Sequence, residues 1–163
     1  MTGARRDWSN DMRWATAADY DRLGEVMYDA IRNGRSLYTE AHRAAWMPRA
    51  YRGEKWHVRL AAQKVLLAKD GPEIAGFLSL TSDGYIDLAF IRPQSQGKGL
   101  FRALYQTQEA DAQTLPRLWT HASLMAQPAF AAVGFGVVKH EMVYISGLAF
   151  ERAEMAKPRL SEF

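Results

Sequence analysis

The segment from Tyr85 to Arg102 constrains this chain most, because in it an apolar strand runs into a turn with two glycines and then into a helix. Pro93 has no N–H for a sheet ladder and restricts the residue before it, so the strand should end near residue 92. Gly97 and Gly99 allow backbone conformations and close approaches that a Cβ atom would block. A strand, a glycine turn and a helix in this order predict a site where backbone groups hold an anion.

The helix after the turn supplies the positive end of that site. Apolar residues recur at helical spacing from Leu100 to Tyr105. The first N–H groups of a helix have no partner within it, and the helix dipole adds partial positive charge at that end. Lys98 and Arg102 add mobile positive charge, so the segment predicts a phosphate ligand.

Two widely known phosphate loops do not fit the segment. A dinucleotide fingerprint needs a third glycine three residues after Gly99, where the chain has Arg102. A Walker loop needs Ser or Thr after its lysine, but Lys98 is followed by Gly99. Both nucleotide-binding interpretations are therefore excluded.

The run from Gln96 to Phe101 resembles the acetyl-CoA pyrophosphate loop of the GNAT superfamily of N-acetyltransferases. That family's pattern is Gln/Arg-x-x-Gly-x-Gly/Ala, and Gln96-Gly97-Lys98-Gly99-Leu100 matches it, while Phe101 departs from it at the last position. An overlapping frame that begins at Gln94 fits the pattern literally, but its distance from Pro93 is less like the family's.

A second match lies downstream, at a distance that the family predicts. Residues 123–135 resemble the GNAT signature Asn/Ser-x-x-Ala-x-x-x-Tyr/Phe-x-x-x-Gly-Phe, with Ser123, Phe130 and Gly134-Phe135 at its defined positions. A plain helix end at Gly134 followed by an aromatic plug is the alternative, which two spaced matches in the right order disfavour.

The resemblance implies an α/β GNAT fold: a mixed, mostly antiparallel central sheet of roughly six to seven strands, flanked by helices, with a splayed acetyl-CoA cleft. It is closest to a bacterial branch whose substrates are largely unassigned. The implied donor is acetyl-CoA, held by a set of residues on the strand, the loop and the downstream helix. These are Phe90, Ile91, Arg92, Gln96, Gly97, Lys98, Gly99, Leu100, Phe101, Arg102, Ser123 and Phe130.

The implied reaction is direct attack of an amine on the thioester, which requires a group to take the amine's proton. An alkyl amine is mostly protonated at neutral pH, with a reference pKa of ~10.4. Asp87 is the first candidate base because several GNAT enzymes place a carboxylate on this strand; the alternative is a solvated charge on a polar face. Glu40 is the reserve, with an exposed helix charge as its alternative. A backbone N–H of Phe90 or Ile91 would stabilise the oxyanion.

The departing thiolate is often protonated by a tyrosine in this family, but the chain has Phe130 at that position. A thiol with a reference pKa of ~8.5 is already a fair leaving group near neutrality. Ser123 could protonate it or could only cap the next helix. His121 and Tyr105 could also serve, although core roles for both are favoured.

The acceptor implied by the resemblance is a primary amine of a small molecule or peptide, bound by Tyr38, Glu40 and Trp46 in the second helical region. A catalytically silent acetyl-CoA-binding sensor with the same fold is the alternative, and a homodimer is left open.

Composition is consistent with one acetyltransferase domain over residues 1–163, since no linker or repeat divides the chain. The chain has no cysteine, and its four histidines do not fall at metal-ligand spacing, so no metal site is expected. A net charge of +3 without a dense basic run suits an anionic ligand better than nucleic acid. No signal-like or membrane-spanning apolar run is present, so a cytoplasmic protein is expected.

Hydrophobic periodicity and turn residues predict an alternating order of elements. Leu23, Val26, Met27 and Ile31 mark one face of a helix that ends near residue 33, and Thr16 with Asp19 resembles a capping box before it. The other expected helices cover 36–50, 54–63, 100–114 and 128–133. The expected strands cover 12–15, 64–68, 74–80, 85–91, 118–122, 137–144 and 148–155.

Overall fold

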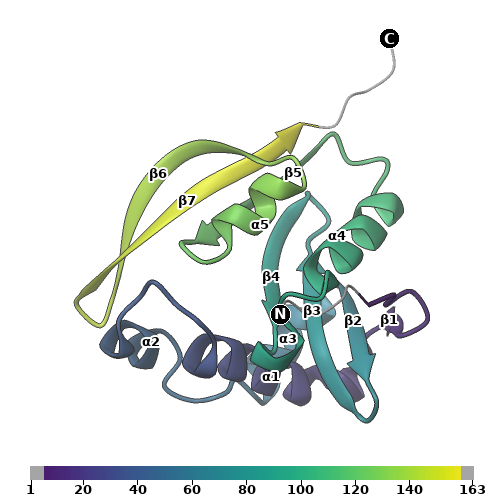
Figure 1. Cartoon of the computed structure of the whole chain (residues 1–163), viewed down its shortest axis with the longest axis horizontal. Helices are drawn as coiled ribbons and strands as arrows, with labels where there is room; N and C mark the ends of the chain where they lie inside the picture. Colours follow the sequence, from purple (N-terminus) through teal and green to yellow (C-terminus); the bar gives the residue numbers. More distant parts are fainter. Residues whose placement is uncertain (1–5, 159–163) are drawn as a thin grey trace.

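A computed structural model of the chain describes residues 6–158, which form one mixed α/β unit (Figure 1). Its seven strands make a single sheet in the order β1-β2-β3-β4-β5-β7-β6, in which β4 and β5 are parallel and all other neighbours antiparallel. The strands are β1 Met12–Trp14, β2 Lys64–Asp70, β3 Glu73–Leu80, β4 Tyr85–Ile91, β5 Arg117–Ser123, β6 Gly136–Ile145 and β7 Leu148–Pro158. The helices are α1 Tyr20–Asn33, α2 Glu40–Trp46, α3 Glu54–Ala61, α4 Leu100–Asp111 and α5 Gln127–Ala132, with 3-10 turns at Ala17–Asp19 and Pro93–Ser95.

The expected order of strands and helices and the mixed, mostly antiparallel sheet are confirmed. β2 and β3 form the hairpin that Asp70-Gly71 predicts, and Gly71 has a φ of +61°, a conformation that favours glycine. Both strands are buried along most of their length because helices cover the two faces of the sheet. None of the helices in the described range is long and apolar enough to cross a bilayer.

Two apolar clusters hold these layers together. On one face α4 packs Leu100 and Leu104 against β2, β3 and β5, in a cluster that also includes Trp8. On the other face α1 packs Leu23 and Val26 against β2, β3 and α3. Each helix is amphipathic and buries its apolar side against the sheet, so the 3.6-residue periodicity identifies the buried side of α1 and α4.

The second helical region is shorter than the sequence predicts. The expected helix over 36–50 is wrong at both ends, because α2 covers only Glu40–Trp46. The hydroxyl of Thr39 accepts a hydrogen bond from the N–H of His42 at 3.1 Å and so caps the helix. Pro48 disfavours helical backbone at Met47, where the helix ends.

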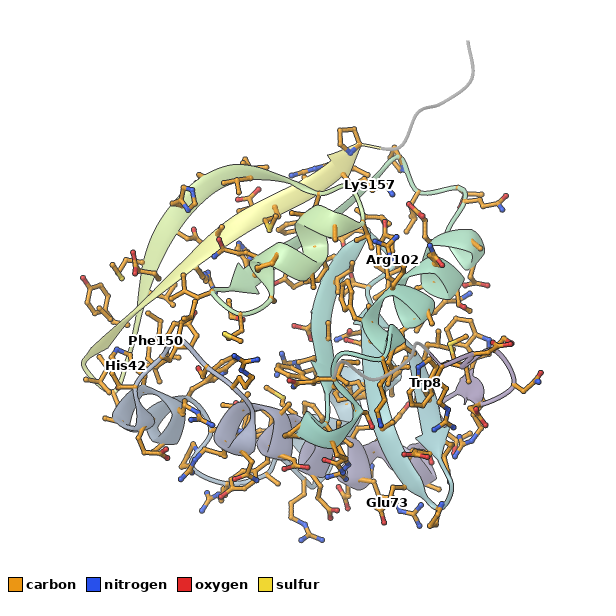
Figure 2. All side chains as sticks on the ribbon, in the orientation of Figure 1. Trp8, His42, Glu73, Arg102, Phe150 and Lys157 are labelled. Atoms are coloured by element: carbon orange, nitrogen blue, oxygen red, sulfur yellow. The ribbon has the colours of Figure 1, made fainter. Side chains whose placement is uncertain are left out.

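The sheet opens between β4 and β5. These strands pair only at Tyr85 with Trp119 and at Ile86 with Thr120, and beyond this point they diverge. The ladder with β3 skips Asp87, which is the extra residue of a β-bulge, and bulges increase local twist. The β6–β7 hairpin bends away from β4 and reaches α2 (Figure 1), where the rings of His42 and Phe150 meet (Figure 2).

Candidate active site

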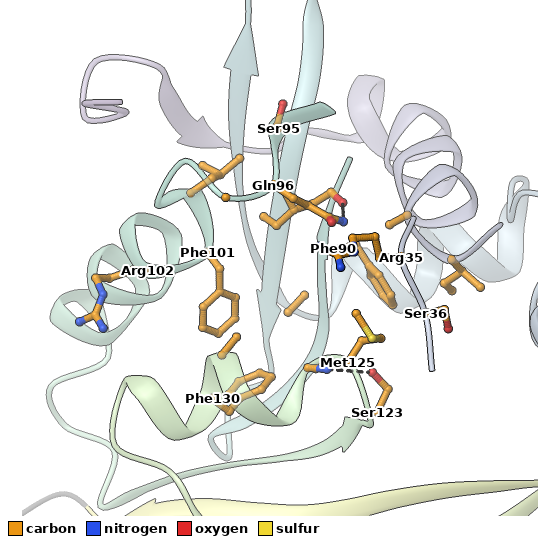
Figure 3. Close-up of a pocket in the computed structure, with 18 of the residues that line it drawn as sticks. Arg35, Ser36, Phe90, Ser95, Gln96, Phe101, Arg102, Ser123, Met125 and Phe130 are labelled. Atoms are coloured by element: carbon orange, nitrogen blue, oxygen red, sulfur yellow. Dashed lines mark hydrogen bonds between the residues drawn. The ribbon is translucent and has the colours of Figure 1, made fainter. Parts of the chain in front are cut away.

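A cleft of about 390 Å³ lies where β4 and β5 diverge (Figure 3). The end of β4, the 95–99 loop, the start of α4, α5 and the end of α1 line it. Most of the predicted site residues meet here. They are Tyr38, Trp46, Phe90, Ile91, Gln96, Gly97, Gly99, Leu100, Phe101, Arg102, Ser123 and Phe130.

The glycine loop presents its backbone N–H groups without partners. In the described part of the chain, no hydrogen bond engages the N–H of any residue from Gly97 to Arg102. Gly97 and Gly99 have φ angles of +77° and +82°, which explains why glycine is needed at both positions. Successive free N–H groups at the start of a twelve-residue helix are the arrangement that can hold an anion, and the binding site itself stays a prediction.

The segment that precedes β1 hydrogen-bonds to the loop. The carbonyl of Lys98 accepts hydrogen bonds from the N–H of Arg6 at 3.3 Å and from Nε1 of Trp8 at 3.2 Å. The Trp8 side chain is buried at 1% exposure. These bonds fix the peptide plane between the two glycines, a contact that no local sequence pattern indicates.

The β5-facing edge of β4 offers a free backbone donor. The N–H of Arg92 donates to the carbonyl of Ala75 on β3 at 2.8 Å. Because N–H directions alternate along a strand, the N–H of Phe90 also faces β3, whereas that of Ile91 faces the gap toward β5. Of the two oxyanion donors that the sequence proposes, Ile91 is therefore the one with a free N–H.

An aromatic pair forms the α4–α5 wall of the cleft. Phe130 is 2% exposed, and its ring lies edge-on to that of Phe101 at 5.0 Å (Figure 3). The side chain of Ser123 lies beside Met125 (Figure 3), and its hydroxyl accepts a hydrogen bond from the N–H of Ala126 at 3.3 Å. Ser123 thus caps the turn into α5 and also lines the cleft.

Asp87 lies outside the cleft lining. Its carboxylate receives two hydrogen bonds from Arg59, at 2.8 and 2.9 Å, and one from the Gln63 amide at 2.8 Å. Burial raises the pKa of Asp87, but the Arg59 and Gln63 hydrogen bonds outweigh it, and the net pKa is below its usual value. Three donors already engage the carboxylate and it does not line the cleft, so this geometry does not favour it as the proton acceptor.

Three other predicted residues also lie away from the cleft lining. Arg92 donates to the carbonyl of Ile74 and pairs with Asp29 at 2.9 Å, which ties β4 to α1. The Glu40 side chain is 71% exposed and lies 3.8 Å from the nearest arginine nitrogens. Lys98 contributes its carbonyl to the loop anchor, and its side chain does not line the cleft.

A side chamber of about 120 Å³ adjoins the cleft and shares Tyr38, Trp46 and Ser123 with it. The Tyr38 hydroxyl donates to the carbonyl of Glu151 at 2.6 Å and accepts from the N–H of Leu124 at 3.1 Å. Tyr38 therefore bridges β7 and the end of β5, and the chamber is closed on that side by an ordered aromatic ring.

His121 also lines the chamber. Its Nδ1 is 2.9 Å from the Tyr85 hydroxyl and its Nε2 is 3.5 Å from the Glu141 carboxylate. Burial, with a further contribution from the positive charge of Arg152, lowers the pKa of His121 below its usual value. A mainly neutral imidazole in the wall of the chamber can accept a proton.

Several lining residues were not singled out from the sequence. Arg35, Ser36 and Met125 line the cleft (Figure 3), and Arg152 lines the chamber. The sequence places the acceptor in the second helical region, whereas Tyr38 and His42 of that region contact β7 about a hundred residues away. Among the described residues, no group of three or more acidic, histidine or cysteine side chains is arranged to hold a metal.

One family model matches most of the chain. A family model described as an acetyltransferase (GNAT) domain matches residues 28–156. No curated protein sequence matches the chain.

Solved structures share the fold along nearly the whole chain. One is described as a GCN5-related N-acetyltransferase, "Aminotransferase, Class-II", from Rhodopseudomonas palustris; it has a TM-score of 0.81 at 22% identity and covers 98% of both chains. The acetyl-CoA-bound yncA, a putative acetyltransferase from Salmonella typhimurium, has a TM-score of 0.65 at 17% identity, covering 93% of this chain and 95% of its own. The paia N-acetyltransferase from Thermoplasma acidophilum, in complex with coenzyme A, has a TM-score of 0.68 at 16% identity, covering 91% and 98%.

Proposed function

The chain belongs to the GNAT acetyltransferase family, and from that premise we propose that it transfers an acetyl group from acetyl-CoA to a primary amine of a small molecule or peptide. The observation that carries the proposal is the run of free backbone N–H groups from Gly97 to Arg102 at one end of a 390 Å³ cleft. Acetyl-CoA has a pyrophosphate for such a site, and two structural neighbours are described with acetyl-CoA or CoA bound.

The residues of the cleft fit the donor along its length. The loop and the start of α4 would hold the pyrophosphate, and the unpaired edge of β4 would hydrogen-bond the amides of the pantetheine arm. The aromatic wall of Phe101 and Phe130 would cover the arm near the thioester.

The reaction proposed is direct acyl transfer. The amine nitrogen bonds to the thioester carbonyl carbon, the carbon–sulfur bond breaks, and the products are an amide and CoA. The N–H of Ile91 would stabilise the negative charge that develops on the carbonyl oxygen, because it is the free donor of β4.

Proton transfer is assigned to His121 in preference to Asp87. The imidazole lines the chamber and would accept the amine's proton directly, through water or through the Tyr85 hydroxyl at 2.9 Å. Glu141 at 3.5 Å would stabilise the imidazolium that forms. The departing sulfur finds no hydroxyl at Phe130, so it would leave as thiolate or be protonated by Ser123 or water.

The loop is tested by comparing two alanine variants. Gly97 and Gly147 have φ angles of +77° and +80°, and an added Cβ meets nothing within 4 Å at either position. The intrinsic backbone strain of Gly97→Ala and Gly147→Ala is therefore matched. Acetyl-CoA should raise the melting temperature of the wild type and of Gly147→Ala. We expect Gly97→Ala to weaken acetyl-CoA binding by about tenfold or more, because its Cβ enters the open space from which the pyrophosphate would approach the loop and so costs about one hydrogen bond to a charged group.

Equal acetyl-CoA stabilisation of both variants would show that the loop is not the donor site. A silent acetyl-CoA sensor is the second candidate, favoured by the absence of a tyrosine at Phe130. Release of CoA when a panel of amines is supplied separates the two, since only an enzyme turns over.

A further inference from the structure

The side chamber next to the cleft has an apolar wall and a polar end. Trp46, Val143, Ile145 and Phe150 form the wall, and Arg152 is the charged residue of the lining. At about 120 Å³ the chamber has room for a small organic group. Its chemistry fits a compact molecule with an apolar body and one anionic group.

Arg152 is held in a way that leaves donors for a ligand. Its Nε donates to the Glu141 carboxylate at 2.8 Å. In the described part of the chain, neither of its two terminal nitrogens makes a hydrogen bond. By contrast, Arg59 and Arg92 use terminal nitrogens on the carboxylates of Asp87 and Asp29.

A guanidinium oriented through Nε presents its two terminal nitrogens as an end-on fork, which matches the two oxygens of a carboxylate. Glu141 already offsets part of the positive charge of Arg152, so a monoanion suits the site better than a phosphate dianion. The side chain is about one-third exposed, which leaves the fork accessible without full hydration.

The chamber and the cleft share Tyr38, Trp46 and Ser123, so a molecule seated in the chamber can reach into the cleft with its amine. We propose, resting on the acetyl-transfer function above, that the acceptor is an amino acid with an apolar side chain, whose carboxylate binds the terminal nitrogens of Arg152. The apolar side chain packs against Trp46 and Phe150, and the amine lies beside His121.

Matched pairs of acceptors test this assignment. L-leucine is compared with 3-methylbutylamine, and L-phenylalanine with 2-phenylethylamine, since each pair differs only by the carboxylate. The measured quantity is the ratio of kcat/KM for the amino acid to that for its amine. Arg152→Gln should lower this ratio by about tenfold or more, as expected for losing a charge-assisted pair. Because every protein is given the same two molecules, their different amine pKa values cancel when ratios are compared.

Arg117→Gln is the control, because Arg117 also pairs with a glutamate across β5 and β7, at 3.4 Å from Glu154, and does not line the chamber. Its ratio should equal that of the wild type. Arg152→Lys keeps the charge without the fork and replaces Arg152→Gln if that variant does not fold; it should also lower the ratio.

The protein could acetylate the simple amines while the Arg152 variants leave the ratio of kcat/KM for amino acid and amine unchanged. That result would overturn the amino-acid assignment and leave the acetyltransferase function intact. The same holds if phosphoethanolamine is the preferred acceptor. No CoA release with any amine, in a protein that acetyl-CoA stabilises, would overturn acetyl transfer itself and the assignment with it.

Discussion

At the scale of single residues, surroundings decide which titratable side chain is available for chemistry. Asp87 has a strand position that suggests a base, yet three hydrogen bonds from Arg59 and Gln63 occupy its carboxylate. His121, on the neighbouring strand, lines the chamber and has a lowered pKa because burial disfavours its charged form. A base must be both reachable and unprotonated, and of these two residues only His121 meets both conditions.

We predict that His121→Gln lowers kcat by ~10²-fold or more, the usual contribution of a general base. Because the His121 pKa lies below its usual value of 6.5, the wild-type kcat should fall as the pH drops through that lowered pKa, where the imidazole becomes protonated. The variant should lose this acidic limb. Pre-steady-state and steady-state rates of CoA release across pH measure both effects.

His140→Gln is the control for that experiment, since His140 is an exposed histidine on β6 and lines neither cavity. Its pH profile should match the wild type. Asp87→Asn tests the competing assignment. We expect it to lower thermal stability, because Arg59 loses its ionic partner, and to change kcat less than His121→Gln does. If only Asp87→Asn loses the acidic limb of the kcat–pH profile, then Asp87 and not His121 is the base.

At the scale of elements, the conformation of the glycine loop depends on hydrogen bonds from a segment about ninety residues earlier in the chain. A turn with two glycines is conformationally free before folding, and freedom lost on binding weakens affinity. Trp8 and Arg6 bond the Lys98 carbonyl and so fix the peptide that joins the two glycines. The chain that precedes β1 therefore orders the loop that we propose as the pyrophosphate site.

Trp8→Phe keeps an aromatic ring in the core but removes the indole N–H together with part of the buried ring, a loss that the control variant below shares. We predict that it lowers the free energy of unfolding by ~1 kcal/mol and also reduces the stabilisation by acetyl-CoA, because the loop becomes less ordered. Thermal melts with and without acetyl-CoA measure both quantities.

Trp56→Phe is the matched control. Trp56 is also buried, and its Nε1 donates to the carbonyl of Tyr20 at 2.6 Å, away from the cleft. Its variant should lose a similar amount of stability yet keep the full acetyl-CoA effect. Identical ligand effects in the two variants would contradict the proposed anchoring of the loop.

At the scale of the whole molecule, helices pack against the sheet on one side of the gap between β4 and β5, and the strands diverge at that gap. Strands β2 and β3 are covered on both faces by α1, α3 and α4, whereas β5 separates from β4 after two residue pairs. The edge of the covered part is fastened by Arg13 on β1, which makes two hydrogen bonds to the buried carboxylate of Asp19, at 2.8 and 2.9 Å. The cleft therefore lies between the helix-covered strands and the part of the sheet that carries the β6–β7 hairpin.

The Arg13 hydrogen bonds, with a further bond from the Thr16 N–H, lower the pKa of Asp19 from 3.8 to about 2, although burial acts in the opposite direction. Because the pKa of Asp19 is lower in the folded state than in the unfolded state, the ionised carboxylate stabilises the fold at pH values above the unfolded-state pKa. This stabilisation is lost as the pH falls from about 4 to about 2. We predict that Asp19→Asn lowers the free energy of unfolding by ~2 kcal/mol at pH 7, and that the difference shrinks over this acidic range. Denaturant titrations at several pH values measure it.

Glu73→Gln, at an exposed position where β3 begins, serves as the reference variant and should leave stability within ~0.5 kcal/mol of the wild type. An Asp19→Asn penalty that stays constant down to pH 2 would mean that the loss comes from packing and not from the ion pair.

The sequence by itself determined the features that depend on short-range patterns. The strand, glycine turn and helix from Tyr85 to Arg102 follow from residues in direct succession, as do the β2–β3 hairpin and the buried face of α1. Two spaced motifs were enough to indicate the family and with it the mixed sheet.

Only the tertiary structure decided which side chains face the acceptor. The partners of Asp87 lie 28 and 24 residues away, and the carbonyl that accepts from Tyr38 lies 113 residues away. Arg152 and His121 come together with Tyr38 and Trp46 because the β6–β7 hairpin folds across α2, a contact with no counterpart in local spacing. Local propensity sets the elements, whereas the chemistry of the chamber depends on how distant elements pack, and that packing follows from the whole core.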